Sequence, residues 1–508
     1  MSMFEFFVSG LGMLLSLTNL LFINIGLLLG IIFGAIPGLT VILGLTLFIP
    51  FTFAMEPITS ILFLLGIYCG GSYGGSITAI LINTPGTPAA AATLLDGYPA
   101  TKKGLARKAL DMALIASVIS GLISATVLLF AAPPISRFTV KFGPPEYFCL
   151  ALFGLSIIAG VSGESLVKGI IAGAIGILIS FVGMDPITGI TRFTFHNFKL
   201  MNGIPLVIAL IGLFALTEIF NSSRDADKRQ HVDEKIFDEK SRLQLSDVTA
   251  VLRTIIRSSF IGTLIGSIPG TGAVTSSFIS YSEAKRRSKH PEEFGKGSLE
   301  GVAAAEAGNN GVTGATLIPL LTLGIPGDGS TAVLFGALLL HGMVPGPSLF
   351  VKQGNVMYAI MIGLIVINLF MFLQGKILIK QFAKISNLKS SIIAPIISIF
   401  CFAGAYSYNN SIFDVSLVIL FSIVSYALLK MKFSLTPLLL GLILGPIAEL
   451  NFRRSMAMSD DSLLIFFTRP ISIILLIILV FSLVTTQMRR ARSNKKRTQI
   501  LNSCLDKV

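Results

Sequence analysis

Residues Gly70–Asp96 read GGSYGGSITAILINTPGTPAAAATLLD, and this stretch guides the interpretation of the whole chain. It is apolar enough for a bilayer, yet it carries Ser and Thr hydroxyls, Asn83 and a helix break at Pro85–Gly86. In hydrocarbon an unpaired backbone group costs several kcal/mol, so a broken helix survives only where protein or a wet cavity covers the break. The stretch therefore predicts a half-helix that begins at membrane depth.

The composition is that of an integral membrane protein. Of the 508 residues, 53% are hydrophobic and only 13% are charged, whereas soluble domains contain roughly 25% charged residues. Since one crossing needs roughly 20 apolar residues, we expect an all-α polytopic membrane protein with about ten to twelve transmembrane or re-entrant helices. The net charge of +13 comes mainly from short loops and the C-terminal end. That distribution is typical of membrane topology and argues against nucleic-acid binding.

A second copy of the broken unit follows later in the chain. The stretch Gly314–Gly336 (GATLIPLLTLGIPGDGSTAVLFG) carries Pro326–Gly327 in place of Pro85–Gly86. An earlier break also recurs, because GIIFGAIPG at Gly30–Gly38 and GTLIGSIPG at Gly262–Gly270 agree at five of nine positions. The two spaced glycines of each motif lie on one helix face and allow close backbone contact. The residues expected at these earlier structural breaks are Gly34, Pro37 and Gly38 in copy one and Gly266, Pro269 and Gly270 in copy two.

The positive charges are distributed oppositely in the two copies. No Lys or Arg lies between the two breaks of copy one, whereas five lie between those of copy two, from Lys285 to Lys296. Four follow the second break of copy one, from Lys102 to Lys108. Because positively charged loops stay in the cytoplasm, the copies are predicted to be two inverted repeats containing Pro-Gly-broken half-helices. Inverted repeats whose broken helices meet near the midplane are typical of secondary transporters.

The longest hydrophilic segment, residues 221–257, is predicted to be a cytoplasmic linker between two halves. The other expected parts are an interfacial or short membrane helix at 1–20, a first membrane half at 21–220 with breaks at 37–38 and 85–86, a second half at 258–450 with breaks at 269–270 and 326–327, a last transmembrane helix at 451–487 and a basic cytoplasmic tail at 488–508. Polar turns are expected at 133–146 and 185–202.

The half-helices that follow the second breaks form the candidate substrate site. A helix N-terminus carries unpaired N–H groups and roughly half a positive charge, so with nearby hydroxyls it binds a carboxylate without a buried Lys or Arg. The candidate substrate-binding residues are Ser76, Asn83, Thr84, Pro85, Gly86 and Thr87 in copy one and Gly324, Pro326, Gly327, Ser330 and Thr331 in copy two. The alternative is that both breaks are packing kinks whose hydroxyls are satisfied internally.

One acid and two amides form a second group of candidates. Glu306, Asn309 and Asn310 stand at i, i+3 and i+4, which places them on one helix face inside an apolar run. Such groups are costly in a membrane and are functional candidates by default. With Asp328 they are candidates for binding a coupling cation, Na⁺ or H⁺, while the alternative for the helix face is a polar clamp between helices. No other metal or cofactor site is expected. Catalytic triads, paired carboxylates and phosphate-binding loops are absent from the sequence, so we do not expect an enzyme.

These motifs resemble those of the large permease subunit of the tripartite tricarboxylate transporters, the TctA-like family. The similarity runs from about Leu21 to beyond Leu450. The similar stretches are GAIPG at 34–38, YCGGSYGGSITAILINTPGTPAAAATLLDGYPATKKG at 68–104, KFGPPEYFCLALFGLS at 141–156, RFTF at 192–195, SYSEAKRRSKHPEEFGKGSLEGVAAAEAGNNG at 280–311, LIPLLTLGIPG at 317–327 and VPGP at 344–347.

The resemblance implies a permease that imports carboxylates across the bacterial inner membrane on an ion gradient. It also implies two protein partners, a small membrane subunit and a periplasmic solute-binding protein that delivers the substrate. Asp328 departs from the small residue expected after the second GIPG motif. The alternatives are an anion channel and a stand-alone secondary transporter for another organic anion.

Overall fold

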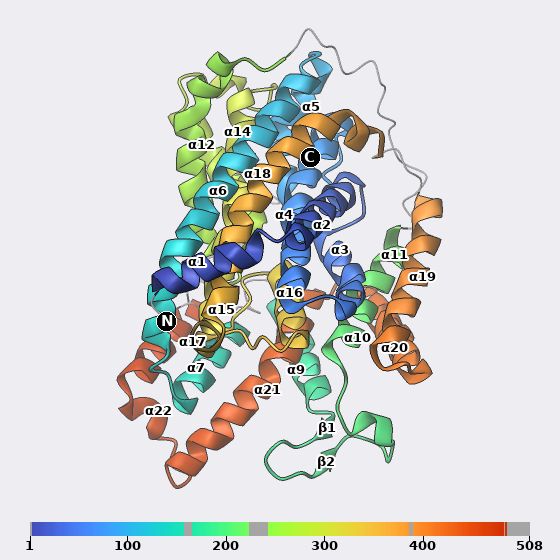
Figure 1. Ribbon diagram of the computed structural model, residues 1–508, viewed down its shortest axis with the longest axis vertical. Helices are drawn as coiled ribbons and strands as arrows, with labels where there is room; N and C mark the ends of the chain where they lie inside the picture. Colours follow the sequence, from blue (N-terminus) through green and yellow to red (C-terminus); the bar gives the residue numbers. More distant parts are fainter. Residues whose placement is uncertain (1–2, 157–164, 223–241, 386–389, 482, 485–508) are drawn as a thin grey trace, which may run out of the picture. The chain divides into compact units, whose positions relative to one another are not determined.

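The computed structural model consists almost entirely of helices (Figure 1). It describes residues 3–156, 165–222, 242–385, 390–481 and 483–484. Within these residues, seven helices are long and apolar enough to cross a membrane, and shorter apolar helices accompany them. The expected all-α polytopic class is therefore confirmed. The basic tail at 488–508 and most of the expected linker lie outside the described residues.

The chain divides into two compact units. Unit 1 comprises Met1–Val140 and Pro205–Ala427, and unit 2 comprises Lys141–Ile204 and Leu428–Val508. This grouping differs from a division at 221–257, because helices from either side of that segment pack together in unit 1.

Copy one lies in unit 1 and consists of long helices alternating with short ones. Its elements, with α1 before them, are α1 (Met3–Leu14), α2 (Leu17–Ala35), α3 (Val41–Phe48), the 3₁₀ helix η1 (Ile49–Ala54), α4 (Pro57–Ile82), the 3₁₀ helix η2 (Pro88–Ala90), α5 (Ala91–Lys102) and α6 (Ala106–Thr139). Helix α2 begins at its N-cap Ser16 and ends before Pro37 and Gly38. Proline lacks the N–H that would continue the helix, and Gly38 has a φ of 87° that glycine tolerates.

The stretch predicted to be copy two lies in the same unit. Its elements are α12 (Leu245–Gly266), α13 (Gly272–Arg287), the 3₁₀ helix η7 (Pro291–Glu293), α14 (Leu299–Ala315), α15 (Leu317–Leu323), α16 (Gly329–Leu340), α17 (Pro347–Lys352) and α18 (Gly354–Ile385). Helix α12 ends before Pro269–Gly270, as α2 ends before Pro37–Gly38.

Two pairs of long helices in unit 1 run antiparallel to each other. Along α4 and α14, Tyr68 hydrogen-bonds with Thr316, whereas Ser72, further along α4, accepts from Asn309, which comes earlier in α14. Helices α6 and α18 show the same relation, because Gly375 lies against Leu114 whereas Gly121 lies against Asn368. Within unit 1, α4 and α14 are therefore antiparallel, as are α6 and α18.

Spaced glycines bring the first two long helices of each copy into backbone contact. A Cβ added at Gly34 of α2 would lie 2.4 Å from the carbonyl oxygen of Gly71 in α4. A Cβ added at Gly262 of α12 would lie 2.8 Å from the carbonyl oxygen of Gly308 in α14. Only glycine permits such an approach, so the repeated motif has a packing role at the same place in both copies.

Asp96, in the middle of α5, joins the two copies. Its side chain is fully buried, and Oδ1 accepts hydrogen bonds from the backbone N–H groups of Gly295, Gly297 and Ser298 at 2.8–2.9 Å. The Tyr281 hydroxyl donates to Oδ2 at 2.9 Å. We call this arrangement the Asp96 strap; it fixes the start of α14 against α5.

Three further helical stretches complete unit 1. They are α10–η4–α11 (Leu206–Leu210, the π-helical Ile211–Leu216, and Thr217–Ser222), α19 (Ser390–Asn409) and α20 (Ile412–Lys430), of which the last three residues fall in unit 2. Thr217 lies within hydrogen-bond distance of the Ser425 hydroxyl, which ties α11 to α20.

Unit 2 consists of helices and one short antiparallel hairpin. Its elements are α7 (Pro144–Ser156), α9 (Leu166–Ser180), β1 (Gly183–Met184), β2 (Thr191–Arg192), the 3₁₀ helix η3 (Phe198–Leu200), α21 (Leu435–Met458), α22 (Ile465–Thr468) and a final helix at Pro470–Phe481. Asp185, beside the hairpin, accepts from Arg453 at 2.7 Å and pairs with Arg192. Hydrogen bonds from the backbone N–H of Ile187 and from Arg453 hold the pKa of Asp185 well below its usual range.

Several boundaries differ from those expected. Helix α12 begins at Leu245, inside the expected linker, because Gln244 and Asp247 form a capping box there. Helix α6 continues through Pro133 and Pro134 to Thr139, whose hydroxyl bonds the carbonyl oxygen of Thr322 at 3.2 Å. The prediction of a polar turn at 133–146 is therefore wrong for residues 133–139, which are helical. The last membrane segment is interrupted at Arg469, which precedes a proline and ion-pairs with Glu146 at 2.5 Å.

Candidate functional site

The strongest candidate site is a cavity of about 250 Å³ in unit 1, onto which four helix N-termini open. These are the starts of α3, η2, α13 and α16, each of which directly follows one of the four Pro-Gly breaks. The lining residues from these starts are Thr40, Val41 and Ile42; Thr87, Pro88 and Ala89; Gly272, Ala273 and Val274; and Asp328, Gly329 and Ser330. We call this the four-start cavity.

The middles of α4 and α14 supply the remaining wall of the four-start cavity. Tyr68 and Ser72 come from α4, and Asn309 and Thr313 come from α14. The Asn309 amide donates to the carbonyl oxygen of Ser72 at 3.0 Å, which fixes the side chain at the wall. Among the described lining residues there is no Lys, Arg or His. Positive potential at this cavity therefore comes from backbone N–H groups at helix ends.

In copy one, the hydroxyl of Thr87, which follows the second break, has no hydrogen-bond partner among the described residues. This hydroxyl is buried on the cavity wall. No side chain caps η2. A buried hydroxyl without a partner is costly and marks a place where a ligand or water would gain a hydrogen bond.

The second break of copy two is different, because Asp328 caps α16. Its Oδ1 accepts from the backbone N–H of Thr331 at 2.8 Å, and the Thr331 hydroxyl accepts from the backbone N–H of Asp328 at 2.8 Å. Asp328 also lines the cavity, so one of its four starts carries a carboxylate.

Several predicted substrate residues lie away from the cavity wall. Gly86 donates its backbone N–H to the carbonyl oxygen of Gly75 at 3.2 Å, so this donor is already used within the protein. Ser76 is buried and bonds Tyr73 within α4, while Asn83 ends α4 in the left-handed region and is exposed together with Thr84. Of the predicted substrate residues, only Thr87 and Ser330 line the cavity. The others, Ser76, Asn83, Thr84, Pro85, Gly86, Gly324, Pro326, Gly327 and Thr331, do not.

The two breaks of copy two are bonded to each other. Gly270 donates its backbone N–H to the carbonyl oxygen of Gly327 at 2.7 Å. Gly324 ends α15 with a φ of 72°, a left-handed conformation that favours glycine. These residues hold the starts of α13 and α16 in place behind the cavity wall.

Glu306 lies one turn before Asn309 in α14 and is fully buried. The Thr93 hydroxyl donates to Oε1, and the Ser117 hydroxyl and the Asn310 amide donate to Oε2 at 3.1 and 3.3 Å. These donors come from α5, α6 and α14. No ion pair of Glu306 occurs among the described residues. A buried, ionised carboxylate without a cationic partner is strongly unfavourable.

Sequence reasoning missed half of the cavity. It treated the first breaks only as structural, although the residues after them, from Thr40 and Gly272 onward, line the wall. It also missed Thr93 and Ser117 around Glu306. The signal that could have found the first breaks is their immediate continuation into a helix, which is the same pattern that identified the second breaks. No group of three or more His, Cys, Asp or Glu that could hold a metal occurs among the described residues.

A family model described as "Tripartite tricarboxylate transporter TctA family" matches residues 20–440. The chain is 36% identical over 479 residues to an uncharacterized 52.8 kDa protein in the TAR-I ttuC' 3' region of Agrobacterium vitis, which covers 94% of this chain and 95% of the relative. It is 38% identical over 239 residues to an uncharacterized protein in the TAR-II ttuC' 3' region of the same organism, covering 47% of this chain and 98% of that relative. No solved structure matches.

Proposed function

We propose that this chain, which belongs to the tripartite tricarboxylate transporter TctA family, binds a tricarboxylate or related carboxylate in the four-start cavity and carries it across the bacterial inner membrane. The observation that carries the proposal is the meeting of four helix N-termini on one cavity without a Lys, Arg or His. Family membership makes the chain a transporter permease; the proposal adds the site, the direction and the coupling.

The electrostatics of the cavity favour a small anion. Each helix N-terminus acts as roughly half a positive charge, so four starts outweigh the single carboxylate of Asp328. The volume of about 250 Å³ lies just below the roughly 300–1,000 Å³ of pockets that hold drug-sized ligands. Thr87 and Ser330 add hydroxyl donors from opposite copies. A compact acid with more than one carboxylate fits this arrangement.

Alternating access is supported by the relation of the two copies. Helices α4 and α14 are antiparallel, and both contribute to the cavity between the breaks. The Lys and Arg residues are distributed oppositely in the two copies, as expected for an inverted topology. In transporters built this way, the substrate site lies near the midplane where the repeats meet. We therefore assign inverted repeats to this chain as part of the proposal.

Coupling is assigned to Glu306 and its neighbours. The Glu306 carboxylate is surrounded by the hydroxyls of Thr93 and Ser117 and the amide of Asn310. A proton would neutralise the carboxylate, and Na⁺ would use the same oxygen atoms as ligands. Asn309 stands one turn along the helix and lines the cavity, so it links the ion group to the substrate. The chain thus acts as a symporter driven by one of these cations.

Two further subunits complete the proposed transporter. Following the family resemblance, they are a small membrane subunit and a periplasmic solute-binding protein that delivers the carboxylate. The basic C-terminal tail would lie in the cytoplasm, as its charge favours.

The proposal is tested by filling the cavity. Ala273→Leu adds bulk at the start of α13, whereas Ser282→Leu adds bulk at an exposed position of the same helix and serves as the control. Both variants are reconstituted with the partner subunits, and uptake of labelled tricarboxylate into vesicles is measured. We expect Ala273→Leu to reduce uptake at least about tenfold, equivalent to 1.4 kcal/mol, and the control to transport normally.

Three outcomes would contradict the proposal. Normal uptake by well-folded Ala273→Leu would place the substrate elsewhere. Uptake that neither saturates nor follows an ion gradient would indicate a channel. Full activity without the binding protein would indicate a stand-alone transporter.

A further inference from the structure

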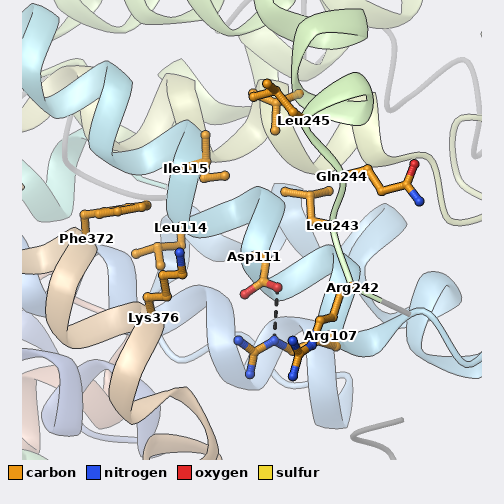
Figure 2. Close-up of a pocket in the computed structure, with 11 residues that line it drawn as sticks. Arg107, Asp111, Leu114, Ile115, Arg242, Leu243, Gln244, Leu245, Phe372 and Lys376 are labelled. Carbon is orange, nitrogen blue, oxygen red and sulfur yellow. Dashed lines mark hydrogen bonds and ion pairs between the residues drawn. The ribbon is translucent and has the colours of Figure 1, made fainter. Parts of the chain in front are cut away.

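A second cavity in unit 1, of about 530 Å³, lies at the ends of three long helices (Figure 2). Arg107 stands in the first turn of α6, Arg242 precedes α12, and Lys376 lies in the last third of α18. Because α6 and α18 are antiparallel, the start of one lies beside the end of the other. Leu114 of α6 packs directly on Gly375 of α18, which places the floor of the cavity between these helices. We call it the helix-end pocket.

The charged groups of the helix-end pocket are predominantly positive. Three cations, from Arg107, Arg242 and Lys376, share the lining with one acid, Asp111. Arg107 pairs with Asp111 at 3.0 Å, as Figure 2 shows. The Lys376 ammonium lies 5.6 Å from the centre of the Phe372 ring. Among the lining residues, the basic groups therefore outnumber the acidic ones by three to one.

Apolar side chains make up the rest of the wall. Leu114, Ile115, Leu243, Val248 and Phe372 line the pocket beside the cations. The apolar wall continues on the outside of two of the helices. Leu252, one turn after Val248 in α12, is exposed, as is Leu369, one turn before Phe372 in α18. Both continue from the charged end toward the middle of a membrane-spanning helix. One end of the pocket thus suits an anion, and its apolar side leads to a surface that suits hydrocarbon.

We propose that the helix-end pocket binds one anionic phospholipid of the surrounding bilayer, with its phosphate among Arg107, Arg242 and Lys376 and an acyl chain along Val248 and Phe372. Guanidinium groups bind phosphate through paired hydrogen bonds. Basic pockets between membrane helices on the cytoplasmic side bind anionic headgroups, and the predicted topology places Lys102–Lys108 on that side. A small soluble anion would leave the apolar wall unused.

The site does not depend on the proposed transport role. All of its lining residues differ from those of the four-start cavity. A bound lipid would bridge α6 of copy one and α12 and α18 of copy two, and so would stabilise their packing. Its presence is measurable on the purified chain without any substrate.

The test uses the full chain purified in detergent. Native mass spectrometry counts bound phosphatidylglycerol, and thermal unfolding is followed with added phosphatidylglycerol, phosphatidylcholine or inorganic phosphate. The test variant is Arg242→Gln with Lys376→Gln, both at exposed positions. The control variant, Lys285→Gln with Lys289→Gln, removes two exposed positive charges, one in the last turn of α13 and one just after the helix.

We expect phosphatidylglycerol to raise the unfolding temperature more than phosphatidylcholine does. The test variant should bind it about 30-fold more weakly, which is the effect of losing two cations worth about 1 kcal/mol each. The control variant should bind as the unchanged chain does. Asp111→Asn should bind more tightly by about fivefold, because it removes the one acid of the wall.

Two results would overturn the proposal. Equal retention of phosphatidylglycerol by the test variant and the control would show that these cations do not hold it. If inorganic phosphate stabilises the chain as well as phosphatidylglycerol does and displaces it, the pocket binds a small anion instead of a lipid.

Discussion

The helix starts that follow the second breaks of copy one and copy two line the same cavity, but their chemistry differs. In copy one the Thr87 hydroxyl has no partner among the described residues, and η2 has no side-chain cap. In copy two Asp328 caps α16 and exchanges hydrogen bonds with Thr331. The repeat therefore builds a cavity whose two sides are unlike. Copy one offers the unpartnered Thr87 hydroxyl, whereas in copy two Asp328 accepts from the N–H of Thr331 and presents a carboxylate.

The largest effect is expected for membrane orientation. If the two copies are inverted, equivalent loops lie on opposite sides of the membrane, and each residue is labelled from one side only. We expect single cysteines at Lys103 and Lys289 to be labelled from the cytoplasm and a cysteine at Glu56 from the opposite side. The measurement uses a membrane-impermeant maleimide on intact cells and on inverted vesicles. Labelling of positions 56 and 289 from the same face would end the inverted-repeat interpretation.

The next largest effect should come from the glycines of the two breaks. A Cβ at Gly86 would lie 2.0 Å from the carbonyl oxygen of Gly34, whereas a Cβ at Gly327 would lie 3.1 Å from side-chain atoms of Thr316. We expect Gly86→Ala to lower the free energy of unfolding by about 3 kcal/mol and Gly327→Ala by less than about 1 kcal/mol. Thermal unfolding of the purified variants measures this. Equal losses would mean that the two breaks are packed alike.

Glu306→Gln should separate folding from coupling. The amide keeps the size of the side chain and can still bond Ser117 or Thr93, so we expect normal expression but loss of ion-dependent uptake of at least about tenfold, or 1.4 kcal/mol. Glu300→Gln is the control on the same helix, since Glu300 accepts from Thr254 and Ser288 in a similar way. Unchanged Na⁺ and pH dependence in both Glu306→Gln and Asn310→Ala would reduce this group to a structural clamp.

Asp328→Asn tests the carboxylate of copy two. Asparagine also caps helices, so stability should change little, while removal of one negative charge should tighten carboxylate binding by about 1 kcal/mol, roughly fivefold. The measurement is the substrate concentration for half-maximal uptake. A weaker apparent affinity, accompanied by altered ion dependence, would instead make Asp328 a cation ligand.

The smallest expected effects distinguish the two threonines. Thr87→Ala removes a hydroxyl that has no partner, so stability should be unchanged while apparent substrate affinity falls about fivefold, or roughly 1 kcal/mol. Thr331→Ala removes part of a capping box, so the free energy of unfolding should fall by about 1 kcal/mol. Thermal unfolding and uptake are measured on both. If Thr87→Ala loses stability and keeps its affinity, the hydroxyl serves packing.

The sequence predicted the helical class and the repeated breaks, because apolar length and Pro-Gly pairs are local signals. It could not predict how the breaks meet. The starts at Thr40 and Gly272 join the cavity only because the two copies pack together, and no local pattern records that contact. The group around Glu306 has the same origin, since Ser117 lies 189 residues away along the chain.

The sequence pattern placed Glu306, Asn309 and Asn310 on one face of a helix, but it could not show which neighbours each side chain contacts. Residues at i, i+3 and i+4 lie close on a helix but can still meet different neighbours. Asn309 reaches α4 and the cavity, whereas Asn310 bonds Ser117 of α6. Residues on one face of α14 therefore belong to two different polar groups, one at the cavity wall and one around Glu306. This division depends on how α4, α6 and α14 pack together.

The Asp96 strap has a consequence for biogenesis. The first backbone N–H group that Asp96 accepts from, that of Gly295, lies 199 residues further along the chain. At roughly 5–20 residues per second, the ribosome delivers it about 10–40 s after Asp96. Until Tyr281 is made, 185 residues after Asp96, the carboxylate has none of its final donors, and burying it unpaired would cost several kcal/mol. We expect the part of α5 that carries Asp96 to remain in contact with water until α14 has been synthesised. Copy one would then complete its folding only after copy two has been made.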